Sequence, residues 1–248
     1  MSAPAPALAS VATRFGVEVR LTARRAENLL AMLVIPVALL VFFVSLGIPA
    51  DAGDPVDFLL PGVLALAIVA SGLVNLGIAT AYERQYGVLK RLGGSPLTRG
   101  QLVVAKLGAV LVFEALQVVL LIAIAAGPLG WAPAAPPSVA LLVLAVLLGT
   151  AAFAGLGLLL AGTLRAEATL ALANALFLAT LLLGGIVQPL DALPAPLGMI
   201  AGLLPGAALA ELLRQALGTG IGGVGPLVIL AAWAVAVPLA AARTFRWE

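Results

Sequence analysis

The sequence lacks two residue types that carry much of enzyme chemistry, because none of its 248 residues is a cysteine or a histidine. Without them there are no thiol nucleophiles, disulfides or imidazole bases. The usual zinc sites are excluded as well. We therefore expect a protein that is not an enzyme and that binds no metal or cofactor of its own, and an intramembrane enzyme is the least favoured interpretation.

Charged residues are scarce: they make up 10% of the chain, whereas 63% of the residues are hydrophobic and the mean hydropathy is +1.20. An ordinary soluble domain is about a quarter charged. A membrane-spanning helix needs about 20 apolar residues, so this chain holds roughly six of them and no sizeable soluble domain. The composition predicts an all-α, polytopic membrane protein with six transmembrane helices.

A signal-peptide pattern is also missing at the start, since the first long apolar run begins near Leu29 and no short apolar region with a cleavage site precedes it. We expect residues 1–27 to be retained as an N-terminal cytoplasmic helix with an apolar and a basic side, which lies flat at the lipid headgroups. The alternative is a helix or loop that packs on its own protein. The apolar residues are Leu8, Val11, Phe15 and Val19, and the basic ones Arg14, Arg20, Arg24 and Arg25.

Six apolar stretches form the predicted transmembrane domain, residues 28–242. They are about residues 28–48, 58–81, 102–126, 138–163, 169–187 and 224–242, and a cytoplasmic tail follows at 243–248. Glycines in the fourth stretch, such as Gly155 and Gly157, are expected to let another helix approach closely. Trp131, in the uncharged turn before that stretch, lies where an interfacial aromatic residue would lie.

Residues 188–223 are too apolar for a watery loop and too rich in proline for a clean span, so we predict a re-entrant or interfacial region. Within it, Glu211 and Arg214 have the spacing of a local ion pair on a helix. The alternative is that Arg214 gathers anionic lipid or substrate headgroups.

The basic residues predict the orientation. Twelve of them fall on one side of this six-span arrangement and only Arg214 on the other, so the positive-inside rule makes both termini cytoplasmic. We expect a multi-pass protein of a bacterial plasma (inner) membrane. No internal repeat links the first three spans to the last three, so any two-fold symmetry requires a second subunit.

The only long charged interval between the spans is Tyr82–Lys106, which holds five of the thirteen basic residues. Its apolar positions Val88, Leu89 and Leu92 cluster on one side of a short helix that Gly93-Gly94 ends. Ser95-Pro96 and Thr98-x-x-Gln101 then suit a new helix start. This pattern predicts a short helix across the membrane base that passes a push to the second and third spans. The alternative is a basic loop that only sets the topology.

Several motifs resemble the ABC-2-type permeases of ABC transporters, in the drug or lipid exporter branch that includes daunorubicin-exporter permeases. They are Glu83-Arg84, Gly87-Val88-Leu89, Ser95-Pro96-Leu97, Phe58-Leu59-Leu60-Pro61-Gly62 and the run from Gly184 to Arg214. One departure is Gln85, where the common pattern has a third charged residue. The resemblance implies an export permease that forms a dimer, a homodimer by our reading, driven by two cytosolic ATP-binding subunits.

The same resemblance implies the site residues. Those expected to couple to the ATPase, through a coupling helix that fits a groove in it, are Glu83, Arg84, Gly87, Leu89, Lys90, Arg91, Ser95 and Pro96. Those of the re-entrant region are Gly185, Pro189, Pro194, Pro205 and Arg214. The chain has no G-x-x-x-x-G-K-[ST] motif, so ATP and magnesium are expected on the partner ATPase.

Polar residues inside the predicted spans are candidates for a translocation path. Glu114 lies well inside the third span with Gln117 one turn later on the same face, and Asn75 and Asn174 are further candidates. A carboxylate at the bilayer centre costs at least about 2.5 kcal/mol. Glu114 is therefore either a substrate or proton contact, or a neutral acid hydrogen-bonded between helices.

Three functions remain open at this point. The favoured one is the permease of an ATP-driven exporter of a small amphiphile, such as a drug, an antibiotic or a lipid, because the external loops are short. The second is a proton-coupled secondary transporter that uses Glu114. The third is a non-transport membrane scaffold subunit.

Overall fold

The computed structural model describes residues 7–24, 26–47, 54–93, 99–220 and 222–244. Within these ranges the chain forms helices joined by short turns and contains no strand, which confirms the all-α prediction. The helices are α1 (Ala7–Arg24), α2 (Ala26–Ser45), α3 (Pro55–Val69), η1 (Ala70–Leu76), α4 (Gly77–Gln85), α5 (Val88–Gly93), α6 (Arg99–Ala126), α7 (Val139–Thr163), α8 (Ala166–Leu183), η2 (Leu190–Ala192), α9 (Ala195–Gly202), α10 (Pro205–Leu217) and α11 (Gly225–Thr244).

Five helices are long and apolar enough to cross a membrane, so the prediction of a membrane-spanning protein is confirmed. They are α3–η1–α4 taken together, α6, α7, α8 and α11. A sixth span is possible if α9 and α10, which are bent by 76° at a short break, count as one. The predicted span at 28–48 corresponds to α2, whose described apolar stretch, Met32–Ser45, is shorter than the other spans.

The long helix made of α3, η1 and α4 is the centre of the fold. Asp54 caps its first turn by accepting a hydrogen bond from the Val56 amide at 2.9 Å. In its most apolar stretch of 18 residues, 83% is buried inside the protein, whereas the buried share of the corresponding stretch is 17–44% in the four other spans. It extends to Gln85, beyond the predicted end at residue 81. The first charged residues after the second span therefore continue that span as helix.

Close packing of η1 and α4 against α7 depends on glycine. A Cβ atom added to Gly157 would lie 2.6 Å from the Gly72 carbonyl oxygen, and one added to Gly77 would lie 2.8 Å from the Gly157 Cα. On the other face of α7, a Cβ on Gly155 would lie 2.8 Å from the ring of Pro238 in α11. The prediction that small residues of the fourth span allow close approach is therefore confirmed.

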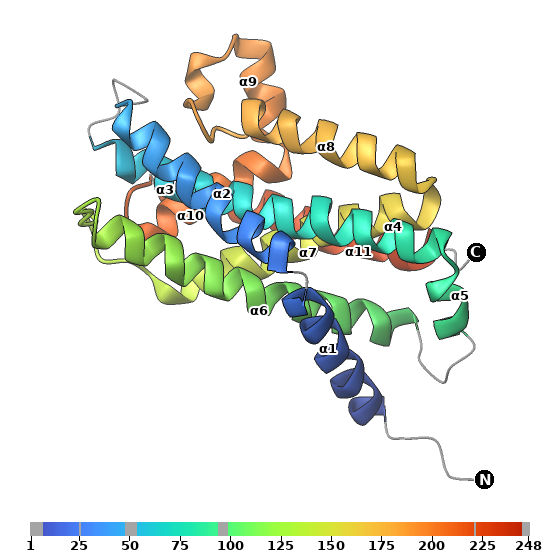
Figure 1. The fold of residues 1–248 in the computed structure, drawn as a ribbon. Helices are drawn as coiled ribbons and strands as arrows, with labels where there is room; N and C mark the ends of the chain where they lie inside the picture. Colours follow the sequence, from blue (N-terminus) through green and yellow to red (C-terminus); the bar gives the residue numbers. More distant parts are fainter. Residues whose placement is uncertain (1–6, 25, 48–53, 94–98, 221, 245–248) are drawn as a thin grey trace.

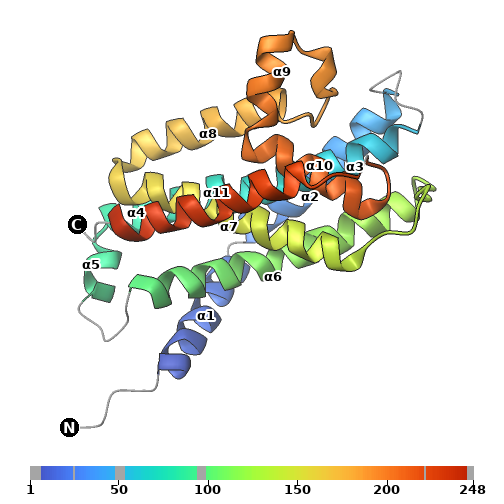
Figure 2. The same cartoon turned by 180° about the vertical axis from the view of Figure 1, so that it is seen from behind.

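The helix ends fall into two groups at opposite ends of the molecule. Figures 1 and 2 both place α5 and the end of α11 at one end, near the side to which α1 extends, and the α6–α7 turn at the other. At the second end, the Ser138 amide donates to the Ala216 carbonyl at 2.8 Å, which joins the start of α7 to α10.

Trp131 was predicted as an interfacial aromatic residue, and that position stays a prediction. Its side chain is buried, and its indole Nε1 donates a hydrogen bond to Asp57 Oδ1 at 2.7 Å. The reason is that the turn after α6 folds back over the start of α3, where Asp57 offers an acceptor that a buried indole needs.

Candidate functional site

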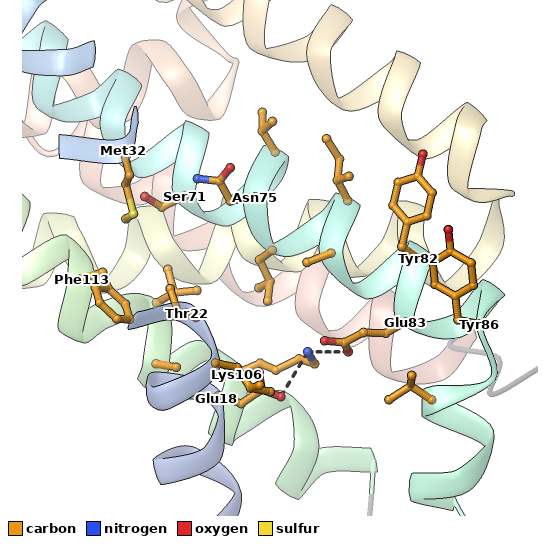
Figure 3. A pocket seen from close by; sticks show the side chains of 18 residues that line it. Glu18, Thr22, Met32, Ser71, Asn75, Tyr82, Glu83, Tyr86, Lys106 and Phe113 are labelled. Carbon is orange, nitrogen blue, oxygen red and sulfur yellow. Dashed lines mark hydrogen bonds and ion pairs between the residues drawn. The ribbon is translucent and has the colours of Figure 1, made fainter. Parts of the chain in front are cut away.

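A partly open pocket of about 530 Å³ lies between α1, α2, η1, α4, α5 and α6. Figure 3 shows Met32, Ser71 and Phe113 at one end and Glu83 and Tyr86 at the other. The pocket therefore joins an apolar end to an ionic end. Its further lining residues are Leu21, Thr22, Val74, Asn75, Leu76, Ile78, Ala79, Tyr82, Val88, Ala109 and Val110, together with the charged Glu18 and Lys106.

The π-helical segment η1 forms one wall of this pocket. Ser71, Val74 and Asn75 line the pocket, while Gly72 packs against the backbone of α7 on the other side. A π-helical turn holds more residues than an α-helical turn, and such turns are frequent at functional sites. In the part of the chain that the structure describes, the exposed side-chain amide of Asn75 makes no hydrogen bond.

Three helices meet at the ionic end through Lys106. Its Nζ lies 2.8 Å from Glu83 Oε2 on α4 and 3.2 Å from Glu18 Oε1 on α1 (Figure 3). Arg14 pairs with the same oxygen of Glu18 at 2.5 Å. Two cations thus balance two carboxylates. We call Arg14, Glu18, Glu83 and Lys106 the ionic cluster.

Helix α1 is held on α6 by an apolar contact as well. A Cβ atom on Gly108 would lie 3.1 Å from the Phe15 ring, so the ring rests directly on the backbone of α6. Phe15 and Glu18 are one turn apart on α1, and the ring contact therefore places Glu18 near Lys106. The alternative for residues 1–27 was a helix that packs on its own protein, and the face of α1 that carries Phe15 and Glu18 packs in this way. The position of the helix at the lipid headgroups stays a prediction.

The predicted ATPase-coupling residues at the end of α4 have partners within this chain. Glu83 pairs with Lys106, and an Arg84 amino group donates to the Leu164 carbonyl oxygen in the α7–α8 turn. Gln85 donates to Glu167 Oε1 at 3.1 Å. This part of the charged interval thus ties α4 to α6 and to the α7–α8 turn.

The remaining coupling residues lie in or next to α5. Gly87 has a φ of +70°, which a glycine adopts at little cost, and it turns the chain from α4 into α5. Leu89 is fully buried, and Lys90 is exposed. Arg91 belongs to α5 although its side chain is outside the description, and Ser95 and Pro96 lie outside the described residues altogether.

The predicted translocation residues are not brought together. Asn75 lines the pocket, but Glu114 and Gln117 are buried outside it and Asn174 is exposed on α8. The Thr150 hydroxyl of α7 donates to Glu114, and Gln117 Nε2 donates to the Met32 carbonyl oxygen at 2.5 Å. Asn174 donates to the Leu170 carbonyl of its own helix at 2.9 Å. Glu114 and Gln117 thus connect neighbouring helices.

Arg214 anchors the region that was predicted to be re-entrant. Its guanidinium lies 4.3 Å from the centre of the Phe58 ring, donates to the Gly185 carbonyl oxygen and pairs with Glu211 at 3.5 Å. The predicted local ion pair of Glu211 and Arg214 is therefore confirmed. Gly185 has a φ of +63°, which shapes the turn after α8.

The prolines of this region mark helix starts. Pro189 precedes η2 and Pro194 precedes α9, while Pro205 occupies the first turn of α10, where its missing N–H costs nothing. Each proline thus lies at the start of a short helix, and α9 and α10 are bent by 76° at the break between them. That this region enters and leaves the same membrane face stays a prediction.

Sequence reasoning missed Glu18 and the role of Lys106. A weak signal exists for each: Glu18 is the single carboxylate among the arginines of α1, and Lys106 is one of only two lysines and is set in an apolar run. A buried lysine requires a counter-charge. Which of the distant carboxylates provides it cannot be told from spacing.

The fold and these contacts define a multi-pass, all-α membrane protein. A family model described as ABC-2 type transporter matches residues 13–217, which include every residue of the pocket. The chain belongs to the ABC-2 type transporter family. No curated protein matches it.

Membership of this family makes the protein a membrane permease of an ABC transporter, a transport component rather than a catalytic domain. It also means that the chain works with an ABC ATPase subunit. The resemblance noted in the motifs is thereby confirmed at the level of the family.

Proposed function

We propose that this permease exports a small amphiphile, such as a drug, an antibiotic or a lipid, when a partner ATPase closes on ATP and magnesium. Two permease copies, a homodimer, and two ATPase copies form the transporter. Both termini and α5 face the cytoplasm of a bacterial cell, across its inner membrane.

The observation that supports this proposal is the connection of α5 to several spans. Leu89 is fully buried in a cluster with Leu76 at the end of η1, Leu102 of α6, Leu158 of α7 and Ala241 of α11. A force on α5 therefore reaches four spans through this cluster, and reaches α4 also through the turn at Gly87. This is the connection that a coupling helix needs.

Charge reversal on α5 tests the proposal. Lys90→Glu is made in the permease co-expressed with its ATPase and is expected to leave membrane insertion intact. Co-purification of the ATPase and ATP-dependent export are expected to fall at least about tenfold, because charges of like sign facing each other suppress docking. The matched control is Asp191→Lys, an exposed charge in η2. If export by the Lys90→Glu variant equals that of the control, α5 is not the docking element.

A further inference from the structure

The pocket has the size and the lining of a ligand site. Its volume of about 530 Å³ falls in the range of about 300–1,000 Å³ that small-molecule sites occupy. Met32, Val110 and Phe113 give it an apolar part. The amide of Asn75 lies beside that part on η1. A ligand bound here needs an apolar body and a polar group on one side only.

At the ionic end, the two pocket-lining glutamates are more accessible than the pocket-lining lysine. The Lys106 side chain is 3% exposed, whereas the side chains of Glu18 and Glu83 are 9% and 17% exposed. Lys106 directs its ammonium group at both carboxylates. The carboxylates keep more accessible surface, and each can accept further hydrogen bonds. The accessible surface therefore suits a group that donates hydrogen bonds or carries positive charge.

Two tyrosines next to Glu83 add to this preference. The rings of Tyr82 and Tyr86 stack with their centres 6.1 Å apart and an angle of 22° between their planes, and both line the pocket. Aromatic faces attract cations, and quaternary ammonium groups in particular. An anionic headgroup would instead meet two carboxylates, because the Lys106 ammonium group is already paired to both.

We propose that this pocket, within one subunit, binds an amphiphile with a cationic headgroup. The apolar body lies along Met32, Val110 and Phe113, and the headgroup lies against Glu83 and Glu18. The proposal rests on the export function proposed above and names the cargo class and its site. Because Tyr86 and Val88 also line the pocket, the ligand contacts the start of α5.

Binding to the full-length permease in phosphatidylcholine nanodiscs tests the proposal without an ATPase. The probes are tetraphenylphosphonium and tetraphenylborate, which share one shape and carry opposite charges, and empty nanodiscs give the background. We expect saturable binding of the cation and none of the anion. The measurement uses no ATP, so a failure of the ATPase proposal would leave it unaffected.

Two variants locate the site. Glu83→Gln removes one negative charge from the pocket wall, and Ala79→Phe fills the pocket without changing a charge; each is expected to weaken binding of tetraphenylphosphonium at least about tenfold. The matched controls, Glu167→Gln and Ala171→Phe, change exposed residues of α8 outside the pocket and are expected to bind as the unchanged protein does.

Either of two results overturns the proposal. One is that the Ala79→Phe variant, with an unchanged thermal midpoint, binds the cation as well as the unchanged protein does. The other is that the borate binds as tightly as the phosphonium and is lost in the same variant, since a site without charge preference contradicts the cationic headgroup.

Discussion

The buried Lys106 and the half-buried Arg214 of this permease are held in opposite ways. Lys106 joins α1, α4 and α6 through two carboxylates that border a pocket. Arg214 is bound to a backbone carbonyl, an aromatic ring and a carboxylate of its own helix. The contacts of Lys106 can change partners when the helices move, because each is an ion pair between separate elements. Those of Arg214 hold one arrangement, because a guanidinium has fixed donor directions.

The largest effect is expected from Arg214→Leu. The variant loses a charged hydrogen bond to the Gly185 carbonyl and the contact with Phe58, which together stabilise the fold by about 2–4 kcal/mol. The measurement is the thermal midpoint of the purified permease. Arg243→Leu, an exposed arginine at the end of α11, is the control and is expected to leave the midpoint unchanged. Equal midpoints for the two variants would show that Arg214 is not an anchor.

A smaller and local effect is expected from Lys106→Met, which leaves Glu83 without its cation and Glu18 with Arg14 alone. Because Arg14 still pairs with Glu18, the cost stays below the roughly 3–5 kcal/mol of a broken buried ion pair, and about 1.4 kcal/mol is enough to raise the opening of α1 about tenfold. The measurement is the rate of trypsin cleavage at Arg20 and Arg24. Lys90→Met is the control on an exposed lysine. Unchanged cleavage would mean that α1 does not depend on the ionic cluster.

Gly108→Leu separates the apolar contact of α1 from its ion pairs. The new side chain meets the Phe15 ring, and overpacking of this kind costs about 1 kcal/mol or more, so cleavage of α1 should rise about fivefold. Gly100→Leu is matched, because a side chain there meets nothing within 4 Å. A rise in both variants would assign the effect to helix propensity instead of to Phe15.

The smallest effect is expected from Glu114→Gln. Glu114 lies outside the pocket and accepts a hydrogen bond from Thr150, which the amide oxygen of glutamine can also accept. We expect the same export rate and the same thermal midpoint within about 2 °C. A secondary transporter would be favoured by a different result. The unchanged protein would then export its cargo along a proton gradient without any ATPase, and the Glu114→Gln variant would lose that export.

Five of the predicted apolar runs coincide with helices long enough to cross a membrane, because these runs are long compared with the turns between them. The second span runs on to Gln85, however, since the polar side chains of Glu83, Arg84 and Gln85 have partners elsewhere in the chain. Read alone, such a polar run indicates the end of a helix. Their partners lie 23, 80 and 82 residues away, which no local pattern reveals.

The pocket is harder to predict, because its walls are brought together by packing between helices that are distant in the sequence. Glu18 reaches Lys106 only because Phe15 rests on Gly108, and the π-helical turn at η1 forms beside glycines that contact α7. Asn75 was predicted as a polar lining residue from its place in a span. Glu114, chosen for the same reason, is buried between α6 and α7 instead.

The π-helical segment has a practical consequence for experiments on this protein. Before it in the chain, α3 packs against α2 and α10; after it, α4 packs against α7 and α8. Because η1 adds residues to a turn, a helical wheel drawn with one period through residues 55–85 assigns wrong faces to one half. Cysteine-accessibility scans or cross-linking designs along this helix should restart their periodicity at residue 77.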